Sequence, residues 1–227
     1  LLLVTALVFD ILKIRWQTRL VGVQRIIIGI IIGTLGILLM LSPWNFAPGI
    51  IFDTRSILLS ISGLFFGLVP TIIAMVMASL FRFMQGGVAT ITGISVIIAT
   101  GSIGIAWRYL RKKKIEQIKM VELYLFGLLN HVVMLLLMLT LPRETAFSVL
   151  GKISFPVLLI YPIVTAILGF LLVNRVQRET VFNLLQEREE QLSLAINSAN
   201  IGFFEEDLEN EEYKYSPEWK GQLGYLP

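Results

Sequence analysis

Charged residues and a pair of glycines border strongly apolar runs between residues 48 and 87. They are Asp53, Arg55, Arg82, Gly86 and Gly87. Because an ionisable group at membrane depth is costly unless it pairs or faces water, such a cluster marks a candidate site. Arginine offers a planar fork to a carboxylate, and glycine amides let an anion approach the backbone closely. Two arginines against one aspartate leave a positive surplus, which favours a small anionic ligand.

A simpler interpretation of these residues stays open: Asp53 pairs with one arginine, and the three charged side chains only anchor helix ends. Two further polar residues, Asn130 and His131, lie within the apolar run 121–141. A histidine in such a run relays protons, contacts a ligand or, most often, packs through a hydrogen bond. His131 is the only histidine of the chain, and its predicted depth makes it a poor phosphoacceptor.

The composition separates the chain into two regions of opposite character. A mean hydropathy of +0.78 excludes an ordinary soluble domain. Residues 1–174 contain 14 Lys and Arg against 5 Asp and Glu, whereas residues 175–227 contain 5 against 11. We therefore predict a basic membrane domain joined to an acidic soluble tail, and no nucleic-acid partner. The chain has no cysteine, which excludes disulfides and thiolate metal sites, and we expect no metal.

The membrane topology is predicted from the apolar segments, which are 1–12, 26–41, 56–81, 89–107, 121–141 and 153–173. The loops 13–25 and 108–119 and the stretch after the last segment are rich in Lys and Arg, so the positive-inside rule places them in the cytoplasm. The first segment is too short to span a bilayer and is interpreted as a truncated helix. Gly29 and Gly33 form a GxxxG pattern, typical of helix association or of tight internal packing.

The number of crossings requires a break in the stretch 56–84. Two full spans between the outer loop before it and the basic loop after it would return the chain to the wrong side, so this stretch must enter and come back. We expect it to break near Gly67 and Pro70 into arms of roughly 11–15 residues, a re-entrant or broken helical hairpin. The prediction is an all-α polytopic membrane domain of about five to six spans, with the candidate site on the outer face.

The acidic tail is expected to contain two parts. Residues 175–198 are predicted to form a helical signalling stalk, because apolar residues recur at alternating spacings of four and three; a short parallel coiled coil or an amphipathic helix packed on its own soluble domain both fit. From residue 199, two alternating stretches around a polar turn predict a β-hairpin. A short helix follows, capped by Ser216 with Pro217 at its first position.

The segment AINSANIGFFEEDLENEEYKYSPEWKGQLGY resembles the opening of a PAS sensor domain. Such domains often begin with a helix ending in A-x-x-G, an aromatic-acidic strand, and a second strand followed by S-P-x-W-K-x-x-L-G-Y. The matching residues are Ala199, Gly202, Phe204, Asp207, Ser216, Trp219, Leu223, Gly224 and Tyr225. The resemblance implies a truncated α/β PAS domain over 199–227 whose cofactor is unknown. We expect no cofactor in the rest of the chain.

The membrane half resembles the five-transmembrane sensor domain of LytS-type receptors. The motif P-G-x-x-F-D-x-R begins at Pro48, the motif G-L-F-x-G begins at Gly63, and Arg82 with Gly86 and Gly87 completes the match. The resemblance implies a bacterial cell-membrane sensor that binds a small molecule, small carboxylates such as pyruvate being the type proposed for relatives. It also implies a fold of five membrane-spanning helices.

Together these features predict the input module of a membrane signal-transduction receptor. The preferred whole protein is a sensor histidine kinase of a two-component phosphorelay, located in the bacterial inner membrane with the tail cytoplasmic. A diguanylate cyclase, a transporter and a bare membrane anchor are the rival interpretations. The expected partners are the anionic ligand, membrane lipids, a second copy of the chain and a response regulator. The sequence has no ATP-binding glycine-rich motif and no GGDEF-like sequence, so no catalytic residue is assigned.

Overall fold

A computed structural model describes most of the chain. It covers residues 21–41, 44–47, 50–52, 54–111, 114–199, 202, 204–207 and 212–224. Asp53, one of the predicted site residues, lies outside the described residues, as do the first apolar segment and the start of the P-G-x-x-F-D-x-R motif. The chain divides into two compact units, Leu1–Val176 and Gln177–Pro227. Each unit is described by itself below.

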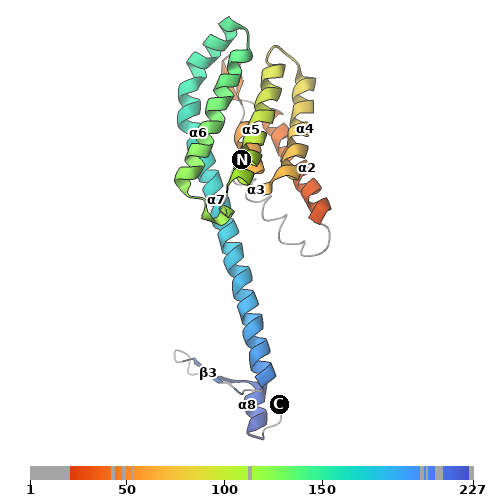
Figure 1. Ribbon diagram of the computed structural model, residues 1–227, viewed down its shortest axis with the longest axis vertical. Coiled ribbons are helices and arrows are strands. Elements are labelled where there is room, and N and C mark those ends of the chain that lie inside the picture. Colours follow the sequence, from red (N-terminus) through yellow and green to blue (C-terminus); the bar gives the residue numbers. More distant parts are fainter. Residues whose placement is uncertain are drawn as a thin grey trace. The chain divides into compact units, whose positions relative to one another are not determined.

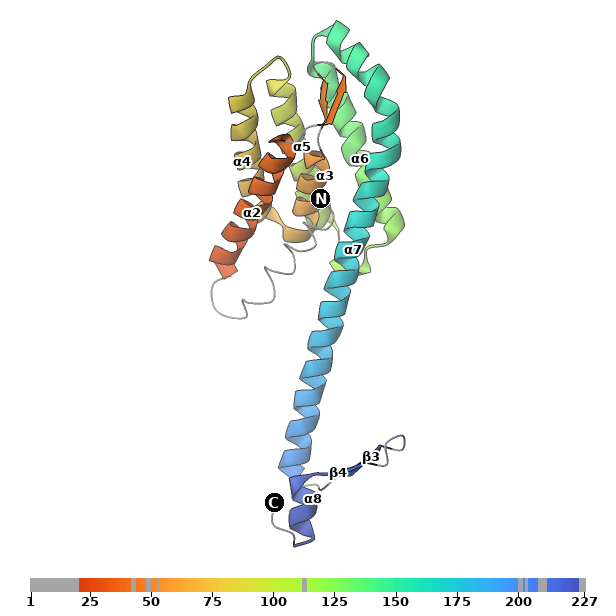
Figure 2. The same cartoon turned by 180° about the vertical axis from the view of Figure 1, so that it is seen from behind.

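The first unit is a bundle of helices, shown from two sides in Figures 1 and 2. Its helices are α2 (Val21–Leu41), α3 (Arg55–Phe66), α4 (Leu68–Gln85), α5 (Thr90–Leu110), η1 (Ile115–Gln117), α6 (Met120–Leu137), η2 (Met138–Thr140) and the first part of α7 (Arg143–Ala199). Five of the described helices, α2, α4, α5, α6 and α7, are long and apolar enough to cross a membrane. The predicted all-α polytopic membrane fold is thereby confirmed.

One element of this unit was not predicted. A short antiparallel pair of strands, β1 (Trp44–Ala47) and β2 (Ile50–Phe52), lies between α2 and α3. The strands have only 4 and 3 residues, and their pairing is irregular between Asn45 and Ala47. Such short runs carry too little alternation to be told apart from a loop in the sequence.

The predicted break in the stretch 56–84 is present at Gly67. This residue ends α3 and begins α4 with a φ of +82°, a conformation that favours glycine. Pro70 does not contribute to the break, because it lies in the first turn of α4, where proline removes no helical hydrogen bond. The first arm has 12 residues, as expected, but the prediction for the second arm was wrong. It has 18 residues and is long enough to cross a membrane.

The two arms form a helical hairpin, with the start of α3 and the end of α4 at the same end of the unit. Arg55 at the start of α3 and Arg82 near the end of α4 both lie beside Gly93 in the first turn of α5. At the opposite end, Arg108 near the end of α5 bonds the carbonyl oxygen of Leu64 near the end of α3. Figure 1 shows the α4–α5 turn and the α6–α7 turn at the same end of the unit.

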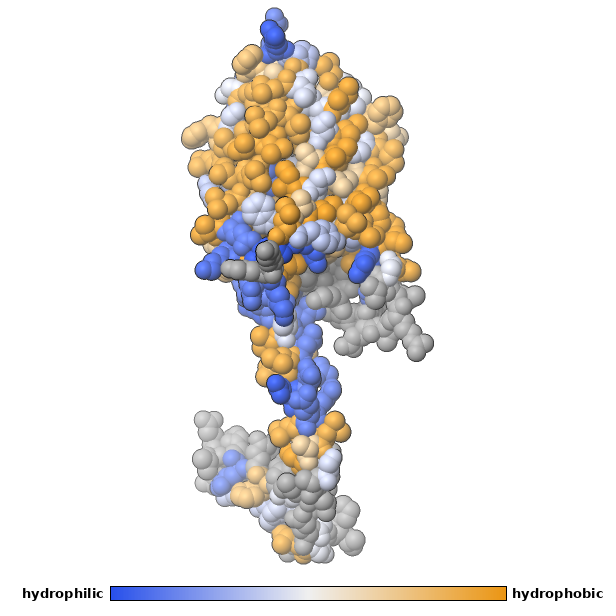
Figure 3. Space-filling view, viewed as in Figure 1, coloured by the Kyte–Doolittle hydropathy of each residue, from blue (hydrophilic) through white to orange (hydrophobic). Residues whose placement is uncertain are grey.

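Helix α3 forms the centre of the bundle, and every residue from Ser56 to Phe65 is buried. Small residues let its neighbours approach closely: a Cβ added at Gly63 would lie 2.7 Å from the carbonyl carbon of Gly104. The GxxxG glycines of α2 serve internal packing, since an added Cβ at Gly29 would lie 2.8 Å from Ile73 Cβ of α4. Apolar side chains cover most of the visible surface of this unit, as a membrane environment requires (Figure 3).

The second unit contains the end of α7, two strands and a short helix. The strands β3 (Phe204–Asp207) and β4 (Glu212–Tyr215) pair antiparallel, and α8 (Pro217–Gln222) follows. The side chain of Ser216 accepts a hydrogen bond from the amide of Trp219 at 3.2 Å, so the predicted cap is confirmed. The indole of Trp219 stacks on Tyr215 with ring centroids 4.5 Å apart. The predicted hairpin and helix are therefore present, and the PAS assignment stays a prediction.

Candidate functional site

Two of the predicted site residues, Arg55 and Arg82, converge on a single backbone position of α5. A Cβ built on Gly93 would lie 2.6 Å from Arg82 Nε and 3.3 Å from Arg55 Nη2. Both guanidinium groups therefore occupy the space next to this glycine, although the two arginines are separated by the α3–α4 hairpin in the sequence. Both side chains are half-buried. The structure thus brings together the two cations that the sequence singled out.

The fold explains how these positions meet. Arg55 opens α3, Arg82 lies in the last turn of α4, and Gly93 lies in the first turn of α5. Helix α4 reverses the chain after α3, and α5 reverses it again, so α3 and α5 run parallel and in close contact. The start of α5 therefore lies beside the start of α3. The absence of a side chain at Gly93 leaves the space that the Arg82 guanidinium fills.

Arg82 has hydrogen-bonding capacity to spare. Its Nη1 donates to Gln85 Oε1 at 3.2 Å on the surface. Its Nε is buried and has no hydrogen-bond partner among the described residues. A buried donor without an acceptor costs about 1–3 kcal/mol, so an oxygen placed beside Nε would be favourable. A carboxylate can accept from Nε and a terminal nitrogen of the same guanidinium at once.

The glycine pair at the predicted site has a demonstrable structural role. Gly86 and Gly87 have φ values of +67° and +94° and form the turn between α4 and α5. The Gly86 amide donates to the carbonyl oxygen of Phe83 at 3.1 Å, and the Gly87 carbonyl oxygen accepts from Thr90. The predicted use of glycine amides as ligand donors therefore does not apply to the Gly86 amide in this conformation, since that donor is already engaged.

Beside Arg55 begins a group of buried polar residues that joins three helices. Ser56 Oγ of α3 lies 3.4 Å from His131 Nε2 of α6, and His131 Nδ1 lies 2.6 Å from the carbonyl oxygen of Gly127. The imidazole packs edge-on against the ring of Tyr161 in α7, with centroids 5.0 Å apart. Asn130 Nδ2 donates to the carbonyl oxygen of Phe126 at 2.8 Å. Asn130 and His131 are thus both fully buried and each makes a hydrogen bond, although Asn130 Oδ1 has no partner among the described residues.

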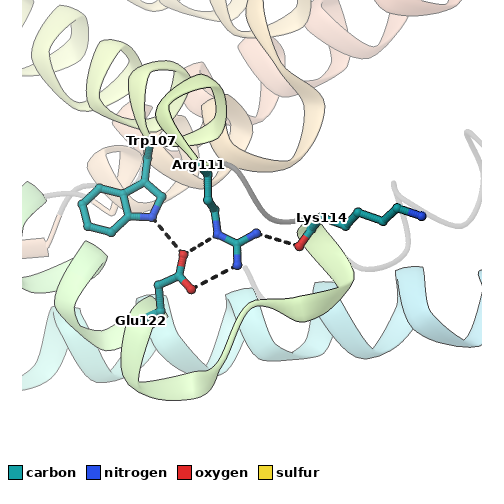
Figure 4. Close-up of polar contacts among 4 residues, drawn as sticks. All are labelled: Trp107, Arg111, Lys114 and Glu122. Carbon is teal, nitrogen blue, oxygen red and sulfur yellow. Dashed lines mark hydrogen bonds and ion pairs between the residues drawn. The ribbon is translucent and has the colours of Figure 1, made fainter.

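A second polar cluster fastens the opposite end of the unit (Figure 4). Arg111, which follows α5, forms an ion pair with Glu122 in the first turn of α6. Its Nη2 donates to Glu122 Oε2 at 3.1 Å and its Nη1 to the carbonyl oxygen of Lys114 at 2.6 Å. Trp107 Nε1 donates to Glu122 Oε1 at 3.3 Å. The cluster connects α5 to α6. It gives Arg111, one of the basic residues of the loop 108–119, a structural role.

Sequence reasoning missed the residues that complete these groups. Gly93, Ser56 and Gln85 were not predicted as members of a site, although each contacts a polar group discussed above. The signal available in the sequence was only that Ser56 directly follows Arg55. Within the described residues, no group of three His, Cys, Asp or Glu side chains is placed to hold a metal ion.

Comparison with known proteins gives one match. The sequence profile of the family described as the 5TMR of 5TMR-LYT matches residues 8–175. No curated protein and no solved structure matches the chain. The matched region covers well over half of the sequence. It includes the membrane-capable helices α2, α4, α5 and α6 and the part of α7 before residue 176. The chain therefore belongs to the 5TMR-LYT family, the five-transmembrane sensor domains of LytS-type receptors.

Proposed function

We propose that this chain is the input module of a bacterial sensor histidine kinase and binds a small carboxylate between Arg55 and Arg82. The membrane receptor role follows from the family. The observation that carries the ligand class is the buried, unpartnered Nε of Arg82 beside the guanidinium of Arg55. Two guanidinium groups in a partly buried position attract an anion, and their planar forks favour a carboxylate or a similarly shaped group.

The orientation of the module follows from its loops. Lys and Arg are concentrated in the loop between α5 and α6 and after the last apolar segment. The positive-inside rule places this end in the cytoplasm and the α4–α5 turn on the outer side of the inner membrane. On this orientation the arginine pair faces the outside, Asp53 orients one of the two arginines, and Gly86 and Gly87 shape the rim of the site.

The acidic region carries the signal inward. Residues 175–198 act as the signalling helix, and residues 199–227 are the beginning of a PAS domain. The support is the hairpin of β3 and β4 followed by a helix capped at Ser216, in the order that a PAS opening requires. The receptor works as a homodimer, and its kinase domain passes the phosphoryl group to a response regulator. A diguanylate cyclase would use the same module with a different output.

The ligand proposal is tested by thermal unfolding of the purified chain in lipid nanodiscs. Pyruvate should raise the melting temperature, because a ligand at about 100 times its Kd stabilises the folded state by about 2.7 kcal/mol. Methyl pyruvate, which lacks the negative charge, should have no effect. Arg82→Ala should abolish the rise, whereas Arg143→Ala, an exposed arginine at the start of α7, should keep it. An unchanged response of Arg82→Ala would overturn the site assignment.

The output is tested on the full-length receptor. Incubation with radiolabelled ATP should label a histidine of the kinase, with the label passing to an aspartate of the response regulator. Formation of a cyclic dinucleotide from GTP would instead assign the module to a diguanylate cyclase. Uptake of labelled pyruvate into proteoliposomes containing the chain would favour the transporter interpretation and contradict the receptor proposal.

A further inference from the structure

We infer that Ser56, His131 and Tyr161 form a relay that couples the ligand site to the signalling helix α7. The inference rests on the proposed function in one respect: it takes the arginine pair as the input. What carries it is a continuous set of contacts from α3 through α6 to α7, made by buried polar or aromatic side chains.

The first contact links the ligand site to α6. Ser56 is the residue after Arg55 on α3, so a displacement of the arginine moves the same helical turn. Its hydroxyl is buried and lies 3.4 Å from His131 Nε2. Because His131 Nδ1 lies 2.6 Å from the Gly127 carbonyl oxygen, Nδ1 carries the proton and Nε2 is the acceptor. The serine hydroxyl therefore donates to His131, and this hydrogen bond acts together with the shorter one to Gly127 in holding the imidazole orientation.

The second contact links α6 to α7 at a proline. The imidazole of His131 meets the ring of Tyr161 at 90°, and Pro162 follows directly. One turn before His131, a Cβ added at Gly127 would lie 3.0 Å from Pro162 Cα and 2.9 Å from Thr165 Cβ. The backbones of α6 and α7 are thus in contact next to the two rings. Because little free space remains there, a rotation of the His131 imidazole must displace Tyr161.

The position in α7 explains why this contact has an effect at a distance. A proline inside a helix removes one backbone hydrogen bond and weakens the helix locally. Tyr161 and Pro162 lie in the membrane part of α7, and the same helix runs without interruption to Ala199. A bend at this point is therefore carried along α7 into the segment that follows the membrane. Ligand-induced movement of Arg55 changes that bend through Ser56 and His131.

The chain offers a matched control for this relay. Ser60 lies one turn after Ser56 on α3 and is also buried, but among the described residues its hydroxyl bonds only the carbonyl oxygen of Ile57 on its own helix. Ser60→Ala removes a buried hydroxyl from α3 without touching His131. Ser56→Thr keeps a hydroxyl at the relay position, and His131→Phe keeps a ring against Tyr161 but removes the acceptor.

The reporter for the test is a nitroxide on Asn183→Cys, an exposed position of α7, in a chain that has no other cysteine. Its EPR spectrum is recorded with and without pyruvate in nanodiscs, and thermal unfolding is recorded in parallel to report binding. We expect Ser56→Ala and His131→Phe to keep the pyruvate-induced rise in melting temperature and to lose most of the spectral change. Ser56→Thr and Ser60→Ala should behave like the parent. A full spectral change in Ser56→Ala would overturn the relay.

A second measurement tests the relay without a ligand. It is needed if pyruvate changes neither the melting temperature nor the EPR spectrum of the parent, a result that would contradict the proposed ligand but not the relay. In the absence of ligand, Ser56→Ala should alter the spectrum of the label on Asn183→Cys. In a His131→Phe background the same substitution should have no further effect, because the path is already interrupted. Equal effects of Ser56→Ala in both backgrounds, or no effect in either, would contradict the relay.

Discussion

Arg108 Nη1 lies 2.9 Å from the carbonyl oxygen of Leu64 and also donates to the carbonyl oxygen of Phe65 at 2.8 Å. The last carbonyl groups of a helix lack partners within that helix, and α3 ends inside the bundle at Gly67. A guanidinium from α5 thus satisfies the broken end of α3 where water is scarce. The structure uses a charged side chain here to make an interrupted helix tolerable in a membrane.

Replacing Arg108 by methionine should therefore destabilise the bundle. The substitution keeps an apolar stem of similar length but leaves the carbonyl groups of Leu64 and Phe65 without this donor. Each buried unsatisfied group costs about 1–3 kcal/mol, so we expect a clearly lower melting temperature in nanodiscs. Lys119→Met, which removes an exposed cation before α6, is the control and should leave the melting temperature nearly unchanged. Equal melting temperatures for the two variants would contradict the capping role.

The ion pair between Arg111 and Glu122 should contribute measurably to stability (Figure 4). The side chain of Arg111 is 9% exposed and that of Glu122 is 30% exposed, so solvent screens the pair only in part. A double-mutant cycle of Arg111→Met and Glu122→Gln should give a coupling energy of about 1 kcal/mol, reduced at high salt. A coupling energy near zero would mean that any loss of stability in Arg111→Met comes from the lost hydrogen bond to the Lys114 carbonyl oxygen and not from the ion pair.

The glycine pair between α4 and α5 should be necessary for stability because of the backbone conformation of the turn. A Cβ added at Gly86 or Gly87 would meet nothing within 4 Å, so space is not the constraint. Both residues have positive φ, and Gly86, with a φ of +67° and a ψ of −163°, lies in a region that essentially only glycine adopts, at a cost of about 1–3 kcal/mol for other residues. Gly86→Ala and Gly87→Ala should each lower the melting temperature, and Gly86→Asn should lower it as much as Gly86→Ala. Parental melting temperatures for these variants would exclude backbone strain as the reason for the glycine pair.

The sequence was sufficient to predict those features that depend on local pattern or on counting crossings. The break at Gly67 followed from the number of membrane crossings together with the conformational freedom of glycine. The length of α4 did not follow, because Pro70 was taken as a breaker, whereas a proline in the first turn begins a helix without penalty. The cap at Ser216 followed because it depends only on residues adjacent in the sequence.

The composition of the candidate site was predictable only in part. Arg55 and Arg82 stood out because a charge in an apolar background is costly. Gly93 did not stand out, because its importance arises from the rotation of α5, which brings that position under the two arginines. Several glycines occur in α5, and the sequence does not distinguish a glycine that admits a guanidinium from one that admits a neighbouring helix, such as Gly104.

Gly93 offers the sharpest separation of folding from ligand binding. Gly93→Ala places a methyl group 2.6 Å from the present position of Arg82 Nε and 3.3 Å from Arg55 Nη2, so the flexible Arg82 side chain must move. Alanine favours a helix over glycine by up to about 1 kcal/mol, which offsets part of the crowding. We therefore expect a melting temperature close to the parent without ligand and a much smaller rise with pyruvate.

Gly151→Ala is the matched control for this experiment. Gly151 lies in α7, and a Cβ added there meets nothing within 4 Å, so only the helix propensity changes. This variant should unfold at the parental temperature or slightly above it and should keep the full pyruvate response. Titration of both variants with pyruvate by isothermal calorimetry gives the affinities directly. A parental affinity in Gly93→Ala would show that the anion does not bind where the two guanidinium groups meet α5.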